Sequence, residues 1–246
     1  MKILGVIPAR FASTRFPGKP LADLGGKSMI QRVYEQVRKA STISHVIVAT
    51  DHQGIFEHVK NFGGDVCMTR EDHVSGTDRC YEVLTRQTNS FDYVINVQGD
   101  EPFIMPDQID LLGSMLDLQT EIATLVKRID DAASLFNPNV VKAVVGVNGK
   151  ALYFSRSPIP HVRNVPQEQW LDKHSFYKHI GMYAYRADIL KSITALATGT
   201  LEKTESLEQL RWLENGFTIR VAETKTETIG IDTPEDLEAA KKSFLN

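Results

Sequence analysis

Two kinds of segment alternate through the first half of the chain. Short, continuously apolar runs lie at 3–7, 45–50 and 93–97, and their length is typical of buried β-strands. Amphipathic segments with helical spacing lie at 28–39, 52–61, 77–86 and 107–118. Buried strands that alternate with such helices predict an α/β fold, with a mainly parallel sheet and helices on both faces.

The pattern changes after about residue 138. Two apolar runs, 140–147 and 150–155, flank Asn148-Gly149, and this dipeptide is the strongest short-range signal for a β-hairpin. We therefore expect an inserted antiparallel hairpin, then a loop over 157–170. Further predicted elements are strands at 176–185, 217–224 and about 228–231, a helix at 206–214 and a last helix after Thr233. The simplest organisation is one domain over 1–246, with a hairpin and loop excursion at about 138–175.

Composition narrows the class of protein. The chain has 246 residues, of which 42% are hydrophobic, and this argues against disorder. Its net charge of -3 gives no reason to expect a nucleic-acid partner. No apolar segment approaches the roughly 20 residues of a membrane span. The apolar N-terminal run ends at Pro8 and Arg10, too short for a signal peptide. With only Cys67 and Cys80, which form no framework, we expect a cytoplasmic protein.

A basic loop follows the first predicted strand. Arg10, Arg15 and Lys19 are spaced along it among small and turn-forming residues. It is not a Walker loop, because Ser13 and Pro20 stand where that motif needs Gly and Ser or Thr. A solvated surface loop is the plain alternative. Three cations at the carboxyl end of a buried strand favour an anion site, and a nucleoside triphosphate is the obvious ligand.

Two aspartates follow predicted strands from opposite ends of the chain. Asp100 comes after the run at 93–97, where a turn role is about equally plausible on sequence alone. Asp232 precedes the last helix, where Asp is commonly a cap, but Thr233 already provides one. Strand-end carboxylates of this kind suit Mg²⁺ that bridges to substrate phosphates. The two side chains are thus predicted to converge on one Mg²⁺ ion.

Six motifs then give a resemblance that runs nearly from end to end. They are IPARFASTRFPGKPL at 7–21, SGTDR at 75–79, NVQGDEP at 96–102, YKHIGMYAY at 177–185, ESLEQLRWLENG at 205–216 and IDTPEDL at 231–237. In this order they resemble the sugar cytidylyltransferases, and most closely the 3-deoxy-manno-octulosonate (Kdo) cytidylyltransferase family. The resemblance implies a nucleotide-diphospho-sugar transferase-like fold. It also implies Mg²⁺-dependent transfer of CMP from CTP to Kdo for lipopolysaccharide synthesis, by a homodimer.

The resemblance also implies roles for individual residues. Asp100 and Asp232 would be the metal ligands, acting in catalysis with Lys19, Arg10 and Arg15. The nucleotide-binding residues would be Ala9, Arg10, Ser13, Arg15, Lys19, Ser75, Gly76, Thr77, Arg79 and Gln98. The sugar-binding residues would be Gln98, Arg156, His179, Tyr183, Glu208 and Gln209. Taken alone, several have plainer explanations: Ser75 or Thr77 as a helix cap, His179 and Tyr183 as core residues.

Three alternative functions stay open at this point. A sister cytidylyltransferase would act on sialic acid, a polyol phosphate or an amino variant of Kdo. A glycosyltransferase would use a preformed nucleotide sugar and would not need the triphosphate loop. A catalytically silent nucleotide-binding protein would retain the fold without turnover. The sequence does not decide between a hydroxyl and an amino group at the far carbon of the sugar.

Overall fold

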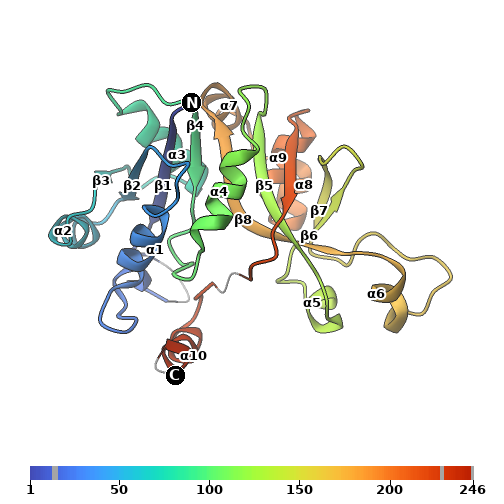
Figure 1. Ribbon diagram of the computed structural model, residues 1–246. Helices are drawn as coiled ribbons and strands as arrows, with labels where there is room; N and C mark the ends of the chain where they lie inside the picture. The colour runs from blue at the N-terminus through green and yellow to red at the C-terminus, as the bar shows by residue number, and fades with distance from the viewer. Residues whose placement is uncertain (13–15, 228–229, 245–246) are drawn as a thin grey trace.

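The computed structural model describes residues 1–12, 16–227 and 230–244, and these form a nine-stranded mixed sheet flanked by helices (Figure 1). The strands are β1 (Ile3–Ala9), β2 (His45–Thr50), β3 (Val66–Met68), β4 (Tyr93–Asn96), β5 (Ile122–Arg128), β6 (Lys142–Val145), β7 (Ala151–Ser155), β8 (Tyr177–Arg186) and β9 (Ile219–Glu223). The α-helices are α1 (Met29–Val37), α2 (Gln53–Asn61), α3 (Gly76–Thr85), α4 (Pro106–Ser114), α5 (Ala132–Phe136), α6 (Trp170–Lys173), α7 (Ala187–Thr194), α8 (Thr200–Glu205), α9 (Gln209–Glu214) and α10 (Pro234–Phe244). Short 3₁₀ turns lie at η1 (Lys19–Leu21) and η2 (Gln167–Gln169).

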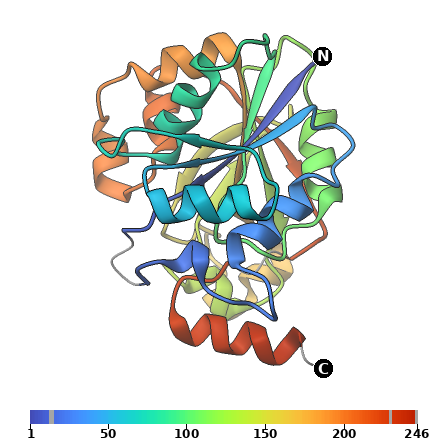
Figure 2. The same cartoon turned by 90° about the vertical axis from the view of Figure 1, so that its left-hand side faces the viewer.

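The strand order is β3-β2-β1-β4-β8-β5-β9, with β6 and β7 beside β8. The first four strands in this order are parallel, and β8 runs antiparallel to β4 and β5 on either side of it. Alternate side chains of β1 enter different cores: Ile3 and Ile7 pack with α1, α2 and α4, whereas Leu4 and Val6 pack with α3, α7 and α9. Helices therefore cover both faces, as Figures 1 and 2 show, and the predicted fold class is confirmed.

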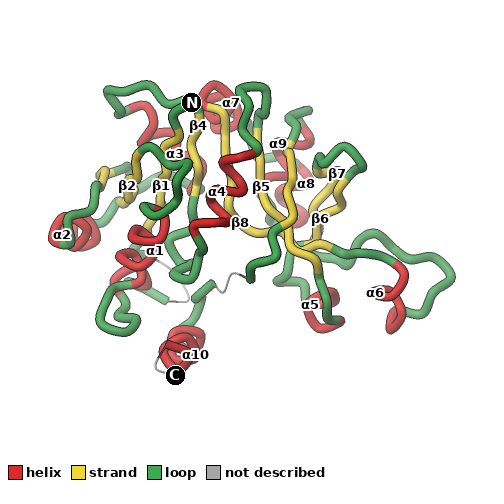
Figure 3. The backbone as a smooth tube through the Cα atoms, in the orientation of Figure 1, coloured by secondary structure: helices red, strands yellow, loops and turns green. Residues whose placement is uncertain are grey.

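The predicted hairpin is present. Strands β6 and β7 pair antiparallel, and Gly149 takes a φ of 70°, which is the left-handed conformation that favours glycine in this turn. Strand β6 also pairs with β8, so the hairpin extends the main sheet (Figure 3). The continuity of this sheet supports one domain, which stays a prediction. No described helix combines the length and apolar character needed to cross a bilayer.

Some predicted elements differ from the structure. The helix expected at 206–214 is wrong at its start, because Ser206 has a φ of 53° and ends α8, so that α9 begins only at Gln209. The loop expected at 157–170 ends in η2, and Trp170 begins α6. The strand expected near 228–231 falls partly outside the described residues, and the described Gly230 and Ile231 lie in no strand.

The last helix packs apart from the two main cores. Leu237 and Ala240 of α10 join Leu24, Met29 and Ile231 in a small separate cluster. The Ile231 N–H donates to the carbonyl oxygen of Asp100 at 2.9 Å, so the C-terminal segment is fastened to the loop after β4. Figures 1 and 3 show α10 below the edge of the sheet where β1 and β4 end. The loop after β1 and the segment that leads into α10 thus meet, through Lys19 and Asp232, at the edge where parallel sheets bind ligands.

Candidate active site

A cavity of about 300 Å³ opens at this edge of the sheet. It lies between the ends of β1 and β4, the start of α3 and the segment before α10. Its lining residues are Pro8, Ala9, Arg10, Ala12, Lys19, Pro20, Gly76, Gln98, Gly99, Asp100 and Asp232. Seven of the predicted site residues are among them: Ala9, Arg10, Lys19, Gly76, Gln98, Asp100 and Asp232.

The charged centre of the cavity joins three segments far apart in sequence. Lys19 Nζ donates to Asp100 Oδ2 at 2.7 Å and to Asp232 Oδ1 at 3.2 Å. The loop that presents Lys19 is closed by Gly18, whose φ of 72° a residue with a Cβ would adopt only under strain, and whose N–H donates to Phe11 O at 2.9 Å. The predicted convergence of Asp100 and Asp232 is therefore seen, with a lysine ammonium between them.

This donor set fits a magnesium ion. Asp100 and Asp232 already contact one cation together, and their side chains keep 33% and 48% of their surface exposed. Over residues 1–12, 16–227 and 230–244, no cluster of three His, Cys, Asp or Glu side chains is arranged to hold a metal. Mg²⁺ commonly takes only one or two carboxylates and completes its shell with water and substrate phosphates.

The remaining nucleotide-side residues surround this centre. Arg10 is exposed, and one guanidinium nitrogen donates to Val74 O at 3.2 Å. Gln98 donates its side-chain amide to Gly181 O at 3.1 Å, which links the cavity to β8. Ser13 and Arg15 lie outside the described residues. Arg10 and Lys19 therefore supply the described positive charge beside the two aspartates.

The segment 75–77 begins α3. The Ser75 hydroxyl accepts the Asp78 N–H at 3.1 Å, so Ser75 is the N-cap, as the plainer interpretation had it. Thr77 is buried and donates to Glu208 Oε2 at 2.8 Å. Gly76, between them, faces the cavity, where a Cβ would contact the Pro8 ring and the Asn96 amide. The backbone at Gly76 is thus the part of this segment that faces the cavity.

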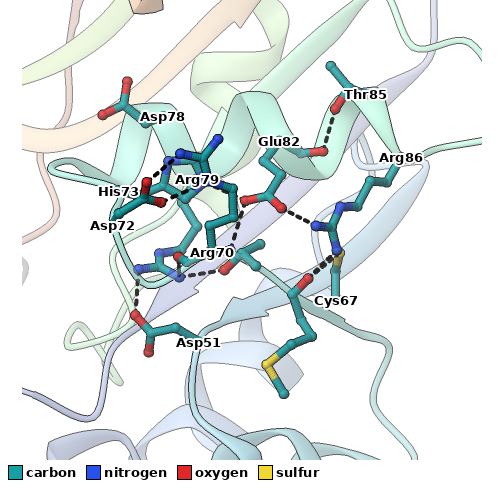
Figure 4. A network of polar contacts seen from close by, with 12 residues as sticks. Asp51, Cys67, Arg70, Asp72, His73, Asp78, Arg79, Glu82, Thr85 and Arg86 are labelled. Carbon is teal, nitrogen blue, oxygen red and sulfur yellow. Dashed lines mark hydrogen bonds and ion pairs between the residues drawn. The ribbon is translucent and has the colours of Figure 1, made fainter.

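The structure does not bring Arg79 to the cavity. Its side chain is fully buried, donates to Asp51 Oδ2 at 2.6 Å and to Arg70 O at 3.2 Å, and also bonds the Thr69 hydroxyl. Figure 4 shows the guanidinium directed at Asp51, beside the separate His73–Glu82 and Arg86–Glu82 pairs. In this arrangement Arg79 joins α3 to the ends of β2 and β3 and is not among the residues that line the cavity.

Of the predicted sugar-side residues, only Gln98 lines the cavity. The rings of His179 and Tyr183 lie 5.1 Å apart on one face of β8, as their spacing predicts. Burial lowers the His179 pKa to about 3, and its Nε2 contacts the Thr124 hydroxyl at 3.0 Å. Desolvation raises the pKa of Tyr183 well above its usual value, and it also raises that of Glu208. At neutral pH the His179 imidazole and the Tyr183 phenol are therefore uncharged polar groups.

Arg156 and Gln209 flank the turn between α8 and α9. Arg156 donates to the carbonyl oxygens of Glu205 at 2.7 Å, Pro138 at 3.2 Å and Ser206 at 3.3 Å. All three of these contacts are with backbone carbonyls, so the guanidinium holds the turn in place without pairing with a carboxylate in them. Gln209 is buried in the first turn of α9.

Two further residues shape the site and were missed from the sequence. Asn96 ends β4 and is 3% exposed, and its Oδ1 has no hydrogen-bond partner among the described residues. An amide in the otherwise apolar run YVIN was the signal available. Gly99 lets the loop after β4 approach β1 closely, since a Cβ there would lie 2.6 Å from Pro8 O. Gly99 therefore sets how closely the loop that carries Asp100 lies to the end of β1.

Comparison with known proteins decides the family. A family model described as cytidylyltransferase matches residues 4–229. A 3-deoxy-manno-octulosonate cytidylyltransferase of Parabacteroides distasonis is 58% identical over 251 residues, covering 100% of this chain and 99% of the relative. This chain belongs to the 3-deoxy-manno-octulosonate cytidylyltransferase family. The resemblance inferred from the motifs is thereby confirmed.

Other members of this cytidylyltransferase family agree. The Cytophaga hutchinsonii protein of the same name is 56% identical over 238 residues, which cover 96% of this chain and 95% of that one. A solved structure of CMP:2-keto-3-deoxy-manno-octonic acid synthetase complexed with CTP superposes with a TM-score of 0.92 at 44% identity. It covers 100% of this chain and 99% of its own. The fold and the family therefore rest on full-length matches.

Proposed function

We propose that the protein transfers CMP from CTP to 3-deoxy-D-manno-octulosonate and releases pyrophosphate. The observation that carries the proposal is the meeting of Lys19, Asp100 and Asp232 in one cavity, in a chain of this family. The anomeric hydroxyl of the sugar attacks the α-phosphorus, a new P–O bond forms, and the bond to the β-phosphate oxygen breaks. Pyrophosphate leaves with the bonding electron pair.

The chain's own residues act mainly by positioning and charge. Lys19 and Arg10 bind phosphate oxygens, with Arg15 as a further candidate in the same loop. Asp100 and Asp232 hold Mg²⁺, which when bound neutralises charge on the phosphates and assists ionisation of the attacking hydroxyl. Gln98 lies between the nucleotide cavity and β8, where it contacts both substrates.

For the sugar, we propose that Arg156 pairs with the carboxylate. The groups assigned to the hydroxyls are His179, Tyr183, Glu208 and Gln209. Two observations support this division: Tyr183 and Gln209 are buried, and desolvation shifts the pKa of His179 and of Glu208. A buried polar group left without a partner penalises a substrate that lacks the matching hydroxyl. Arg156 would therefore set affinity for any sugar acid, whereas Gln209 would set the choice among them.

We also propose a homodimer located in the cytoplasm. The β6–β7 hairpin exposes Val147 fully and Leu152 at 61%, which supports self-association through this element. Cys67 and Cys80 are both free thiols, as is usual in a reducing compartment. Sedimentation of the purified protein tests the dimer.

Pyrophosphate release from purified protein tests the function. We expect release with CTP, Mg²⁺ and the octulosonate, and at least ~10²-fold less with UTP or with sialic acid. Gln209→Ala should narrow the difference in turnover between the octulosonate and other sugar acids. Arg156→Ala should weaken the binding of all sugar acids alike. Equal turnover with sialic acid and the octulosonate would overturn the proposed sugar substrate. Only the assignment to the cytidylyltransferase class would then remain.

A further inference from the structure

Lys19 occupies the position between the two carboxylates assigned to the metal. Its Nζ lies 2.7 Å from Asp100 Oδ2 and 3.2 Å from Asp232 Oδ1, and the lysine side chain is only 11% exposed. An ammonium that contacts both carboxylates neutralises part of their charge and uses oxygens that a metal would need. The site therefore contains a counter-cation supplied by the chain itself.

The backbone of Lys19 is fixed, whereas its side chain can change partner. The Lys19 N–H donates to Phe16 O at 3.2 Å, and its carbonyl accepts the Ala22 N–H at 3.1 Å. The four-carbon stem of lysine carries a compact charge that is free to rotate to another anion. Movement of Nζ away from Asp100 and Asp232 thus needs no change in the loop.

Charge decides when that movement is favourable. Two carboxylates and one ammonium sum to a charge of -1, so a divalent ion that enters first meets the ammonium at close range. A triphosphate offers the ammonium another set of anionic oxygens, with charge-assisted hydrogen bonds. Once Nζ has moved to the phosphates, its positive charge no longer lies between Asp100 and Asp232, and both carboxylates attract a divalent ion more strongly.

We propose that Lys19 is an exchangeable counter-cation, which keeps Asp100 and Asp232 from binding a divalent metal until a nucleoside triphosphate draws its ammonium away. This inference rests on the proposed function, since it takes a triphosphate as the ligand of the cavity. Metal and nucleotide then strengthen each other's binding, and thermodynamic linkage makes the effect equal in both directions. The lysine would thereby favour entry of the metal with or after the nucleotide.

Titration with Mn²⁺ in the absence of nucleotide tests the proposal, with free Mn²⁺ measured by electron paramagnetic resonance. Mn²⁺ prefers the same oxygen ligands as Mg²⁺. Lys19→Met keeps an unbranched stem without the charge, and it should tighten Mn²⁺ binding at least tenfold, or about 1.4 kcal/mol. The matched control is Lys27→Met, because Lys27 pairs with Glu35 on the surface at 2.6 Å. That control should bind Mn²⁺ as the wild type does.

A double variant locates the gain. Lys19→Met with Asp100→Asn should lose the added affinity, because one of the two carboxylates is gone. Equal Mn²⁺ affinity in wild type and Lys19→Met would overturn the proposal that Lys19 is a counter-cation. A gain in Mn²⁺ affinity that persists when Asp100→Asn is added to Lys19→Met would also overturn it. Circular dichroism shows whether each variant is folded. If Lys19→Met does not fold, Lys19→Gln is titrated with Mn²⁺ in its place.

These outcomes are separate from the fate of the proposed function. The Mn²⁺ titration contains neither CTP nor sugar, and it measures only how the chain's own lysine competes for its carboxylates. Absence of pyrophosphate release from wild type would overturn the proposed function whatever the titration gives. Unchanged Mn²⁺ affinity beside normal pyrophosphate release would overturn the counter-cation alone.

Discussion

At the scale of the residue, Asp100 and Asp232 act as a pair. If both hold one metal ion, Asp100→Asn or Asp232→Asn alone should lower turnover by ~10²–10³-fold, as loss of one transition-state contact does elsewhere. The double variant should be hardly worse than either single one, because contacts to one shared ion are not additive. Steady-state kinetics over a range of Mg²⁺ concentrations measures this.

The contrary result is also clear. Losses that multiply in the double variant would mean that the two aspartates act independently, so that one of them serves only its loop or the helix that follows. Asp107→Asn at the start of α4, away from the cavity lining, is the control, and it should keep normal turnover.

His179 makes a prediction about pH and stability. Burial lowers its folded pKa from the usual 6.5 to about 3, so the folded protein keeps this ring neutral where the unfolded chain protonates it. The contribution of neutral His179 to the free energy of unfolding is therefore greatest above pH 6.5. It is lost as the pH falls toward 3, by up to ~1.4 kcal/mol per pH unit. Between pH 7.5 and 5, the wild type should lose about 2 kcal/mol more than His179→Gln.

Urea unfolding at pH 7.5, 6 and 5 measures this difference. Comparison with the Gln variant removes the contribution of the carboxylates that titrate in the same range. Parallel stability curves for the two proteins would mean that His179 is protonated in the folded state, against the burial argument.

Sequence predicted the site best where function depends on where a strand ends. Asp100 follows β4 and Lys19 ends the loop after β1, and the rule for parallel sheets brings such residues together. The rule does not account for Asp232, because Gly230 and Ile231 directly before it lie in no strand. The pairing of Arg79 with Asp51, away from the cavity lining, was not foreseen, because the two residues are 28 positions apart and nothing local marks the pair. Burial of the Gln209 side chain likewise depends on how α9 packs, which a polar helix pattern does not reveal.

At the scale of the element, one arginine joins three helices on the sugar side. Arg211 of α9 lies 3.1 Å from Glu202 of α8, 2.9 Å from Glu208 at the start of α9, and 3.1 Å from Leu196 O after α7. Its side chain is 7% exposed. Arg211→Met should therefore cost about 3 kcal/mol of unfolding free energy, because two partly buried carboxylates lose their cation.

An exposed arginine provides the control for this prediction. Arg70 pairs with Asp72 on the surface, where both side chains are about two-thirds exposed, so Arg70→Met should lower the free energy of unfolding far less than Arg211→Met does. Chemical denaturation of both variants gives the comparison. Equal losses would show that Arg211 contributes no more than a surface charge.

Elements were predictable from sequence where a local pattern decided them. Strand β2 and the β6–β7 turn were predicted from an apolar run and an Asn-Gly pair. Strand β5 was not predicted, although it lies inside the sheet between β8 and β9. The division of 200–214 into α8 and α9 depends on the left-handed Ser206, whose adjacent carbonyls are bound by the distant Arg156.

At the scale of the whole molecule, the site exists only because the C-terminal helix is held against the N-terminal loop. Asp232 immediately precedes α10, and α10 packs through Leu237 and Ala240 in a cluster separate from both main cores. A weakened cluster should therefore release α10 and Asp232 while the sheet stays folded, since separate packing units open independently. Leu237→Ala removes a side chain that is 6% exposed, a change that costs ~2–5 kcal/mol where the surroundings do not collapse.

Hydrogen exchange with mass spectrometry distinguishes local release from global unfolding. In Leu237→Ala, we expect faster exchange over 231–244, unchanged protection of β1 and β4, and a fall in turnover that higher Mg²⁺ partly restores, because Asp232 spends less time at the site. Lys242→Ala, on the exposed side of the same helix, should alter neither exchange nor turnover. If β1 and β4 lose protection together with α10, the cluster is part of the main core. The segment with Asp232 and α10 then does not open independently of the sheet.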